Sequence, residues 1–120
     1  MAKNTGKVLS KTVQPSVKIS AKTHLKEYRG LRVKIVALCD SHLLGKILEE
    51  GDTTIDLKAY KSFYEGDIIG ESKAIELLKS AENVNAVGKA SVRALQSAFK
   101  FDPARIKRVK GIPHMQIYKL

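Results

Sequence analysis

The chain has 120 residues, is 43% hydrophobic and 28% charged, and carries a formal net charge of +10. This length and composition are typical of one folded domain and exclude a largely disordered chain. No apolar run approaches the roughly 18 residues of a membrane-spanning helix. The N-terminus also lacks the apolar core of a secretory signal, so we expect neither a membrane protein nor an exported one.

Cysteine usage and the charge distribution narrow the class further. Cys39 is the only cysteine, which excludes an internal disulfide and fits a reducing compartment, so we expect the protein in the cytoplasm. Residues 1–34 contain nine basic residues and one acid, residues 100–120 contain six and one, and residues 35–99 contain seven and ten. This pattern indicates a near-neutral domain with cationic ends.

Residues 1–30 are rich in Lys, Ser and Thr, with Pro15 at their midpoint. Several lysines are four residues apart, as they would be along one face of a helix. The β-branched residues between them and the proline nevertheless disfavour a helix. We therefore expect an extended or disordered basic arm over residues 1–30 and a globular domain over residues 31–120.

A more regular pattern begins at Leu31. The segment "LRVKIVALCD" alternates charged and apolar residues and then becomes wholly apolar, which predicts a strand over about Arg32–Cys39. Four short elements are expected to follow: a turn capped by Asp40 or Ser41 over residues 40–45, a hairpin over 46–58, a turn of helix or a loop over 59–66 and a brief strand over 67–70.

Two helices are expected next, followed by two strands. The segment "ESKAIELLKSA" has a helical stripe of apolar residues, and "NVNAVGKASVRALQSAFK" repeats it over residues 83–100, with Gly88 as a tight helix crossing or a break. The segments "RIKRVKG" and "HMQIYKL" indicate a final strand pair. The order predicts an α+β fold: a small mixed β-sheet with a helix pair packed on one face, plus the extended basic N-terminal arm.

Cys39, Asp40 and His42 are the nearest approach to a catalytic cluster. A cysteine nucleophile needs a base within hydrogen-bond reach and a third group to orient that base. Cys39, however, ends an apolar strand, where an inert buried thiol is usual, and Asp40 suits a cap. His114 has no companion in the sequence that would make it a catalyst. We expect no catalytic residue and no enzymatic activity.

Metal and nucleotide sites have little support in the sequence. No pair among His24, His42, His114 and Cys39 lies at a metal-ligand spacing. The carboxylates around the expected hairpin match no calcium loop: Glu49, Glu50, Asp52 and Asp56. The glycines form neither of the common phosphate-binding loops. We expect no metal, no cofactor and no small-molecule substrate.

The cationic ends suit a polyanion. A Lys-rich or Arg-rich segment gains free energy by neutralising phosphates and releasing their counterions. An anionic membrane surface would also attract it, but the segment lacks the bulky hydrophobes that would anchor it in lipid. The residues expected to contact RNA are Lys3, Lys7, Lys11, Lys18, Lys22, Lys26, Arg29, Arg32, Arg105, Lys107, Arg108 and Lys110.

The type of nucleic acid follows from what the sequence lacks. No recognition helix, zinc module or basic zipper for duplex DNA is visible. Tyr118 is the only aromatic residue in the last strand pair, so base stacking on a sheet has little support. Backbone binding to a structured RNA remains, as in small basic proteins whose cationic extensions are embedded in ribosomal RNA.

Three segments carry a resemblance to a known family: "ALCDSHLLGK" at Ala37–Lys46, "NVNAVGKASVRAL" at Asn83–Leu95 and "VKGIPHMQ" at Val109–Gln116. From about Arg32 to Leu120, the chain resembles a little-characterised archaeal family known only as domain of unknown function, family 424. The resemblance implies no established enzymatic activity and a loose association with the translation apparatus. The arm, residues 1–30, is unlike the usual compact members.

We therefore expect an RNA-binding structural component of the archaeal ribosome, or a factor bound to it. It would contact ribosomal RNA and neighbouring ribosomal proteins. Two alternatives remain at this stage. One is a small enzyme that uses Cys39, His42 or His114, and the other is a protein-binding adaptor of the translation initiation machinery, whose basic arm meets an acidic protein.

Overall fold

The protein is described by a computed structural model that covers residues 17–118. Six strands form one mixed sheet, in the spatial order β6 (Asp67–Ile69), β2 (Ile19–Tyr28), β3 (Leu31–Asp40), β7 (Asn83–Val87), β9 (Ile112–Tyr118) and β8 (Lys107–Val109). Neighbouring strands are antiparallel except β3 and β7, which are parallel. The expected α+β fold with a mixed sheet is confirmed.

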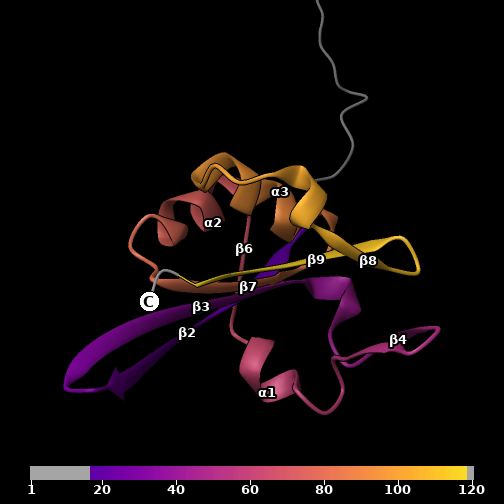
Figure 1. The fold of residues 1–120 in the computed structure, drawn as a ribbon, viewed down its shortest axis with the longest axis horizontal. Helices are drawn as coiled ribbons and strands as arrows, with labels where there is room; N and C mark the ends of the chain where they lie inside the picture. Colours follow the sequence, from indigo (N-terminus) through magenta and orange to yellow (C-terminus); the bar gives the residue numbers. More distant parts are fainter. Residues whose placement is uncertain (1–16, 119–120) are drawn as a thin grey trace, which may run out of the picture.

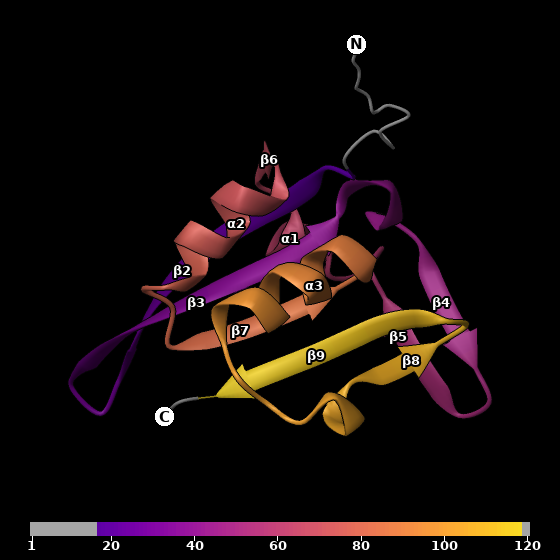
Figure 2. The ribbon, with the colours of Figure 1, turned by 90° about the horizontal axis from the view of Figure 1, so that it is seen from above.

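Helices α2 (Glu71–Leu78) and α3 (Lys89–Ala98) cover one face of the sheet, as the sequence predicted (Figures 1 and 2). Their apolar sides pack on alternate residues of the central strands, and this core is fully closed to solvent at Val36, Val84 and Leu95. Arg93 of α3 donates two close hydrogen bonds to the Glu71 carboxylate of α2, from Nε at 2.9 Å and from Nη2 at 2.7 Å.

Smaller elements lie on the opposite face (Figure 1). They are the 3-10 helix η2 (Ser41–Leu43), the two-stranded hairpin of β4 (Ile47–Glu50) and β5 (Thr53–Asp56), and the helical turn α1 (Lys61–Tyr64). A second buried cluster forms there around Cys39, Leu57 and Val87. A further 3-10 helix, η3 (Pro103–Arg105), precedes β8. The expected hairpin and final strand pair are present, and of the two alternatives for residues 59–66 the structure shows the turn of helix.

The expected boundary at residue 30 is wrong, because Ile19–Tyr28 is a strand of the sheet. β2 pairs with β3 along its whole length, from Ile19 opposite Asp40 to Tyr28 opposite Leu31. Ile19 and Ala21 are buried in the core, whereas the lysines alternate with them on the exposed side. A spacing of four is also two strand repeats, so the lysines share a strand face. The first 16 residues of the expected arm lie outside the described residues.

The expected helix over residues 83–100 is also wrong in its first part. Asn83–Val87 is the central strand β7, paired with β3 on one side and with β9 on the other. Its residues Val84–Val87 are buried, as is typical of a central strand that is covered on both faces of the sheet. Gly88, with φ of 110°, ends the strand, and α3 begins at Lys89. Of the two roles considered for this glycine, the structure shows the break.

Asp40 joins the end of β3 to the start of α3. Its carboxylate accepts hydrogen bonds from Ala90 N at 3.1 Å, from Ser91 N at 2.8 Å and from the Ser91 hydroxyl at 2.8 Å. The helix has no cap from its own N-cap residue, Gly88, so Asp40 satisfies its first N–H groups and complements its dipole. The sequence assigned Asp40 or Ser41 to capping the 40–45 turn, but η2 has no side-chain cap from Asp40.

We predict that Asp40→Ala lowers the free energy of unfolding by about 2–3 kcal/mol, because two helix N–H groups and one hydroxyl lose their acceptor inside the core. Chemical denaturation measures the loss. Asp102→Ala is the matched control: this exposed residue caps η3 through one bond to Ala104 N, and its loss should stay below about 1 kcal/mol. Equal losses of stability in the two variants would show that the hydrogen bonds of Asp40 to α3 stabilise the fold no more than an exposed cap does.

Candidate nucleic-acid interface

The structure places the expected RNA-binding cations in two separate groups. Those from Lys18 to Arg32 lie on and beside the β2–β3 hairpin, and those from Arg105 to Lys110 lie on η3, β8 and the β8–β9 turn. Strands β3, β7 and β9 separate the two groups, and the two turns point to opposite ends of the molecule (Figure 1). The structure therefore does not bring the predicted residues together. Lys3, Lys7 and Lys11 lie outside the described residues.

Both hairpin turns carry a cation in the left-handed backbone region. Arg29 and Gly30 have φ values of 52° and 80°, and Lys110 and Gly111 have values of 53° and 76°. Two-residue hairpin turns favour positive φ at both positions, where Asn-Gly or Asp-Gly is the usual choice. A long basic side chain is unusual there, because its Cβ crowds the carbonyl group in this conformation.

The β2–β3 cations have no acidic partner among the described residues. The two ion pairs within residues 17–118 join Lys61 to Glu65 and Arg93 to Glu71. The Arg29 guanidinium instead lies 5.2 Å from the centre of the Tyr28 ring. The second group has a carboxylate beside it, because Glu50 accepts a hydrogen bond from the backbone N–H of Lys110 at 2.6 Å and so places a negative charge at the β8–β9 turn. The β2–β3 hairpin is therefore the stronger candidate for phosphate contacts.

The strand register brings side chains from four strands into rows on the face opposite the helices. Partners in a register point to the same face of a sheet. One row crosses β2, β3, β7 and β9 and consists of His24, Ile35, Asn83 and Tyr118. The next row consists of Lys22, Ala37, Asn85 and Gln116.

Helix α1 and the β4–β5 hairpin cover this face only in part. α1 is held beside the start of β2, because His24 stacks on Phe63 with ring centroids 4.6 Å apart and the Ser20 hydroxyl donates to Tyr64 O at 2.9 Å. The part left uncovered, which we call the open face, consists of Lys26, Tyr28, Leu31, Asn83, Gln116 and Tyr118. Asn85, in the same row as Gln116, is buried. The side-chain amide of Gln116 donates to Asn85 Oδ1 at 2.6 Å.

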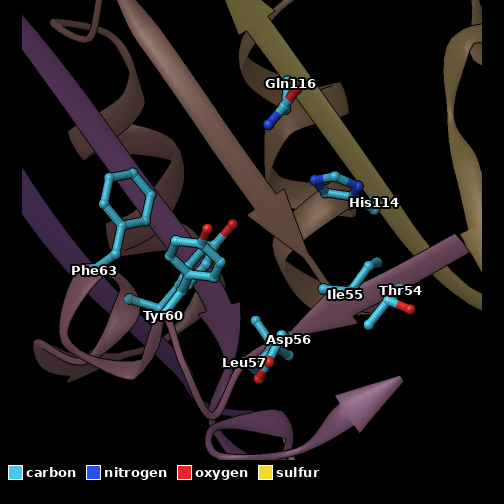
Figure 3. A pocket seen from close by; sticks show the side chains of 9 residues that line it. Thr54, Ile55, Asp56, Leu57, Tyr60, Phe63, His114 and Gln116 are labelled. Atoms are coloured by element: carbon cyan, nitrogen blue, oxygen red, sulfur yellow. The ribbon is translucent and has the colours of Figure 1, made fainter. Parts of the chain in front are cut away.

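A pocket of about 310 Å³ lies between β9 and the smaller layer (Figure 3). It is lined by Thr54–Leu57, by the aromatic residues Tyr60, Phe63 and Tyr64, and by His114 and Gln116. A second hollow, of about 460 Å³, shares His114 and Gln116 and runs to Arg105 and Lys107. A third, of about 250 Å³, lies beside Tyr28 and Asn83. Hollows thus border the open face on several sides.

Burial shifts the pKa values of two titratable groups that line the pocket, and both shifts favour the neutral form. Burial, and secondarily the charge of Lys107, lowers the pKa of His114, so the imidazole is neutral at pH 7. Burial raises the pKa of Tyr64 to about 12, with further contributions from Cys39 and Tyr118. The Asp56 carboxylate is already engaged, since its Oδ1 accepts hydrogen bonds from Lys58 N and Ala59 N.

Cys39, Asp40 and His42 do not assemble into a catalytic cluster. Cys39 is fully buried, and burial followed by the Asp40 charge raises its pKa to about 12, so the thiol stays protonated. The Asp40 carboxylate is committed to α3, and His42 is exposed on η2. Within residues 17–118, no three His, Cys, Asp or Glu side chains gather where they could hold a metal ion.

A family model described as "Protein of unknown function (DUF424)" matches residues 28–120. The chain belongs to this family. No curated protein matches the chain. No helix among the described residues is long and apolar enough to cross a membrane.

A solved structure has the same fold as this DUF424 protein. The crystal structure of an uncharacterized conserved protein from Methanopyrus kandleri is 24% identical, with a TM-score of 0.67, and the match covers 86% of this chain and 92% of the other. The family model matches 93 of the 120 residues, whereas the structural match covers 86% of the chain and is therefore longer. The structural match therefore includes residues before Tyr28, where β2 lies.

Sequence reasoning missed the polar and aromatic residues of the open face. Tyr28 was assigned to the arm, and Asn83 and Asn85 to a helix, so nothing indicated that they share a face of the sheet with Gln116 and Tyr118. The available signal was the even spacing of Asn83, Asn85 and Val87, which is that of one face of a strand.

We predict that the free energy of unfolding falls as the pH is lowered from about 7 to 5. The pKa of His114 is lower in the folded state than its ordinary value of 6.5, so the unfolded chain takes up this proton first. The stability that this difference contributes is complete above pH 6.5 and is lost as the pH falls through the folded-state pKa. His114→Gln should flatten the profile measured by denaturation, whereas His42→Gln, at an exposed position, should not. Identical profiles for the two variants would contradict the assignment.

Proposed function

We propose that this DUF424 protein binds RNA through phosphate contacts and that its target is ribosomal RNA. The observation that carries the proposal is the β2–β3 hairpin, whose cations Lys18, Lys22, Lys26, Arg29 and Arg32 are exposed and have no acidic partner among the described residues. Such a surface gains free energy when it neutralises phosphates and releases condensed counterions.

The geometry of the hairpin favours a polyanion over scattered small anions. Lys22 and Lys26 lie on one strand face, four residues and therefore about 13 Å apart along the strand. Arg29 extends this line to the turn. A ribbon of this kind follows the regular charges of a nucleic acid backbone and requires no enclosed site.

The backbone at the two turns supports the same proposal. A non-glycine residue in the left-handed region costs roughly 1 kcal/mol, and both turns accept that cost for a basic side chain. A turn selected for stability alone would have Asn or Asp beside Gly. Strain of this kind is often retained where a side chain has a function.

The ribosome is the proposed setting because it presents a large folded RNA to small basic proteins. Lys3, Lys7 and Lys11, outside the described residues, add three positive charges upstream of β2. As a component or factor of the ribosome, the protein would act in the cytoplasm and would contact neighbouring ribosomal proteins through its less basic surfaces.

We predict that Lys18→Gln, Lys22→Gln and Lys26→Gln together weaken binding to purified ribosomal RNA and make it less sensitive to salt. The slope of log affinity against log salt should fall by about 2–3, because each phosphate contact contributes nearly one unit. Filter binding between low and moderate salt measures the slope.

The matched control is Lys73→Gln, Lys79→Gln and Lys89→Gln, three exposed lysines in the helix layer. This variant carries the same net charge and should keep most of the affinity and the slope. Sucrose gradients with ribosomal subunits extend the test. If both triple variants behave alike, or the native protein sediments freely at low salt, the proposal fails.

We predict that Arg29→Asn lowers RNA affinity several-fold without destabilising the fold. Asparagine tolerates positive φ better, and this gain of about 1 kcal/mol offsets the lost contact with the Tyr28 ring, which is worth about 0.5–1 kcal/mol at an exposed site. Thermal unfolding and RNA binding are measured on the same preparation. A substantial loss of stability with unchanged affinity would show that Arg29 serves the fold rather than RNA.

A further inference from the structure

Three large aromatic rings stand exposed on and beside the open face. Tyr28 on β2, Tyr60 before α1 and Tyr118 on β9 are 54%, 64% and 60% exposed. Tyr60 lines the pocket beneath β9, and Tyr118 lines the hollow that shares His114 and Gln116 with that pocket. Exposed aromatic rings on a sheet are platforms on which unpaired bases stack.

Amide side chains lie between these rings. Asn83 on β7 and the exposed Gln116 on β9 occupy adjacent rows, and Gln116 donates a hydrogen bond at 2.6 Å to Oδ1 of the buried Asn85. An amide offers both a donor and an acceptor, which suits the mixed donor and acceptor edges of a base. The neutral imidazole of His114 lies one row further along β9.

The charges around the open face are those that a phosphate backbone requires. Lys26 lies at its β2 edge, and Arg105 and Lys107 line the hollow at its β9 edge. Two acids also lie nearby: Glu27 lines the hollow beside Tyr28, and Asp56 lines the pocket beneath β9. The Oδ1 of Asp56 accepts hydrogen bonds from the backbone N–H groups of Lys58 and Ala59. Cations thus lie on both sides of a floor of rings and amides.

We propose that the open face binds an unpaired RNA segment, with its bases stacked on Tyr28 and Tyr118 and one base inserted beside Tyr60. The inference rests on the proposed RNA binding and adds the class of RNA that this surface accepts. Adjacent strands are about 4.8 Å apart, so the four strands from β2 to β9 span the width of a few nucleotides. A duplex does not fit, because its bases are stacked and paired inside the helix and its phosphates alone would meet the rings.

An acidic peptide would satisfy the cations but would leave the rings and the amide pair without a matching partner. The coincidence of planar rings, amides and flanking cations on one face therefore favours RNA over protein as the occupant. A single-stranded nucleic acid provides planar bases and regular charges together, and RNA is the one that the proposed function supplies.

The test uses the full chain and a fluorescent, unstructured oligoribonucleotide, compared with the same strand annealed to its complement. Tyr28→Ala and Tyr118→Ala should each weaken binding of the single strand by about fivefold or more, as expected for a lost stacking contact. Tyr28→Phe and Tyr118→Phe should bind nearly as the native protein does. Ile47→Ala removes an exposed apolar side chain from β4, away from the open face, and should change nothing. Thermal unfolding of each variant verifies that the fold is intact.

Ultraviolet crosslinking followed by mass spectrometry locates the bases directly. Crosslinks at Tyr28, Tyr60 or Tyr118 support the inference. If the alanine variants bind the single strand normally while the Lys18, Lys22 and Lys26 variant loses affinity, the inference is wrong and phosphate binding stands. If no RNA binds at low salt, both are wrong. Displacement of the single strand by a polyglutamate peptide, with loss of the crosslinks, would assign the face to an acidic protein and overturn the inference.

Discussion

The hydrogen bonds between the Asp40 carboxylate and the first turn of α3 fix the arrangement on which the rest of the structure depends. β3 and β7 are parallel neighbours, so the chain that leaves β7 must turn at once to place α3 on the sheet. Gly88 makes that turn, and a Cβ at this position would collide with Asp40. With α2 and α3 confined to one face, the opposite face is left to α1 and the β4–β5 hairpin.

These smaller elements are too short to cover that second face, and their attachments determine which part stays open. Ser20 bonds to Tyr64 O and accepts from Gly66 N, while His24 stacks on Phe63, so α1 is held against the first half of β2. The second half of β2 and the C-terminal half of β9 receive no such cover. Tyr28 and Tyr118 remain exposed for this reason, although both belong to well-paired strands.

Local sequence patterns predicted most elements of the fold but missed the two whose identity depends on distant partners. β2 resembles a disordered basic arm because three of its ten residues are charged and only three are aliphatic. Only its pairing with β3 shows that Ile19 and Ala21 enter a core. β7 was merged with α3 because five residues give too short a pattern to separate from the helix that follows. The cations were evident from composition, whereas the open face was not, since it depends on the register of four strands.

The two separate groups of cations lie on opposite sides of the open face. Phosphate contacts supply affinity and salt dependence but do not distinguish one strand from another, whereas rings and amides respond to bases that are unpaired. The β2–β3 cations stand at one side of the face, and Arg105 and Lys107 stand at the other. A single-stranded RNA that crosses the sheet from β2 to β9 would meet cations at each end and, between them, the rings on which its bases stack. On the proposed function, two distant basic groups are therefore what a path across the sheet requires, and a single continuous patch would serve a duplex equally well.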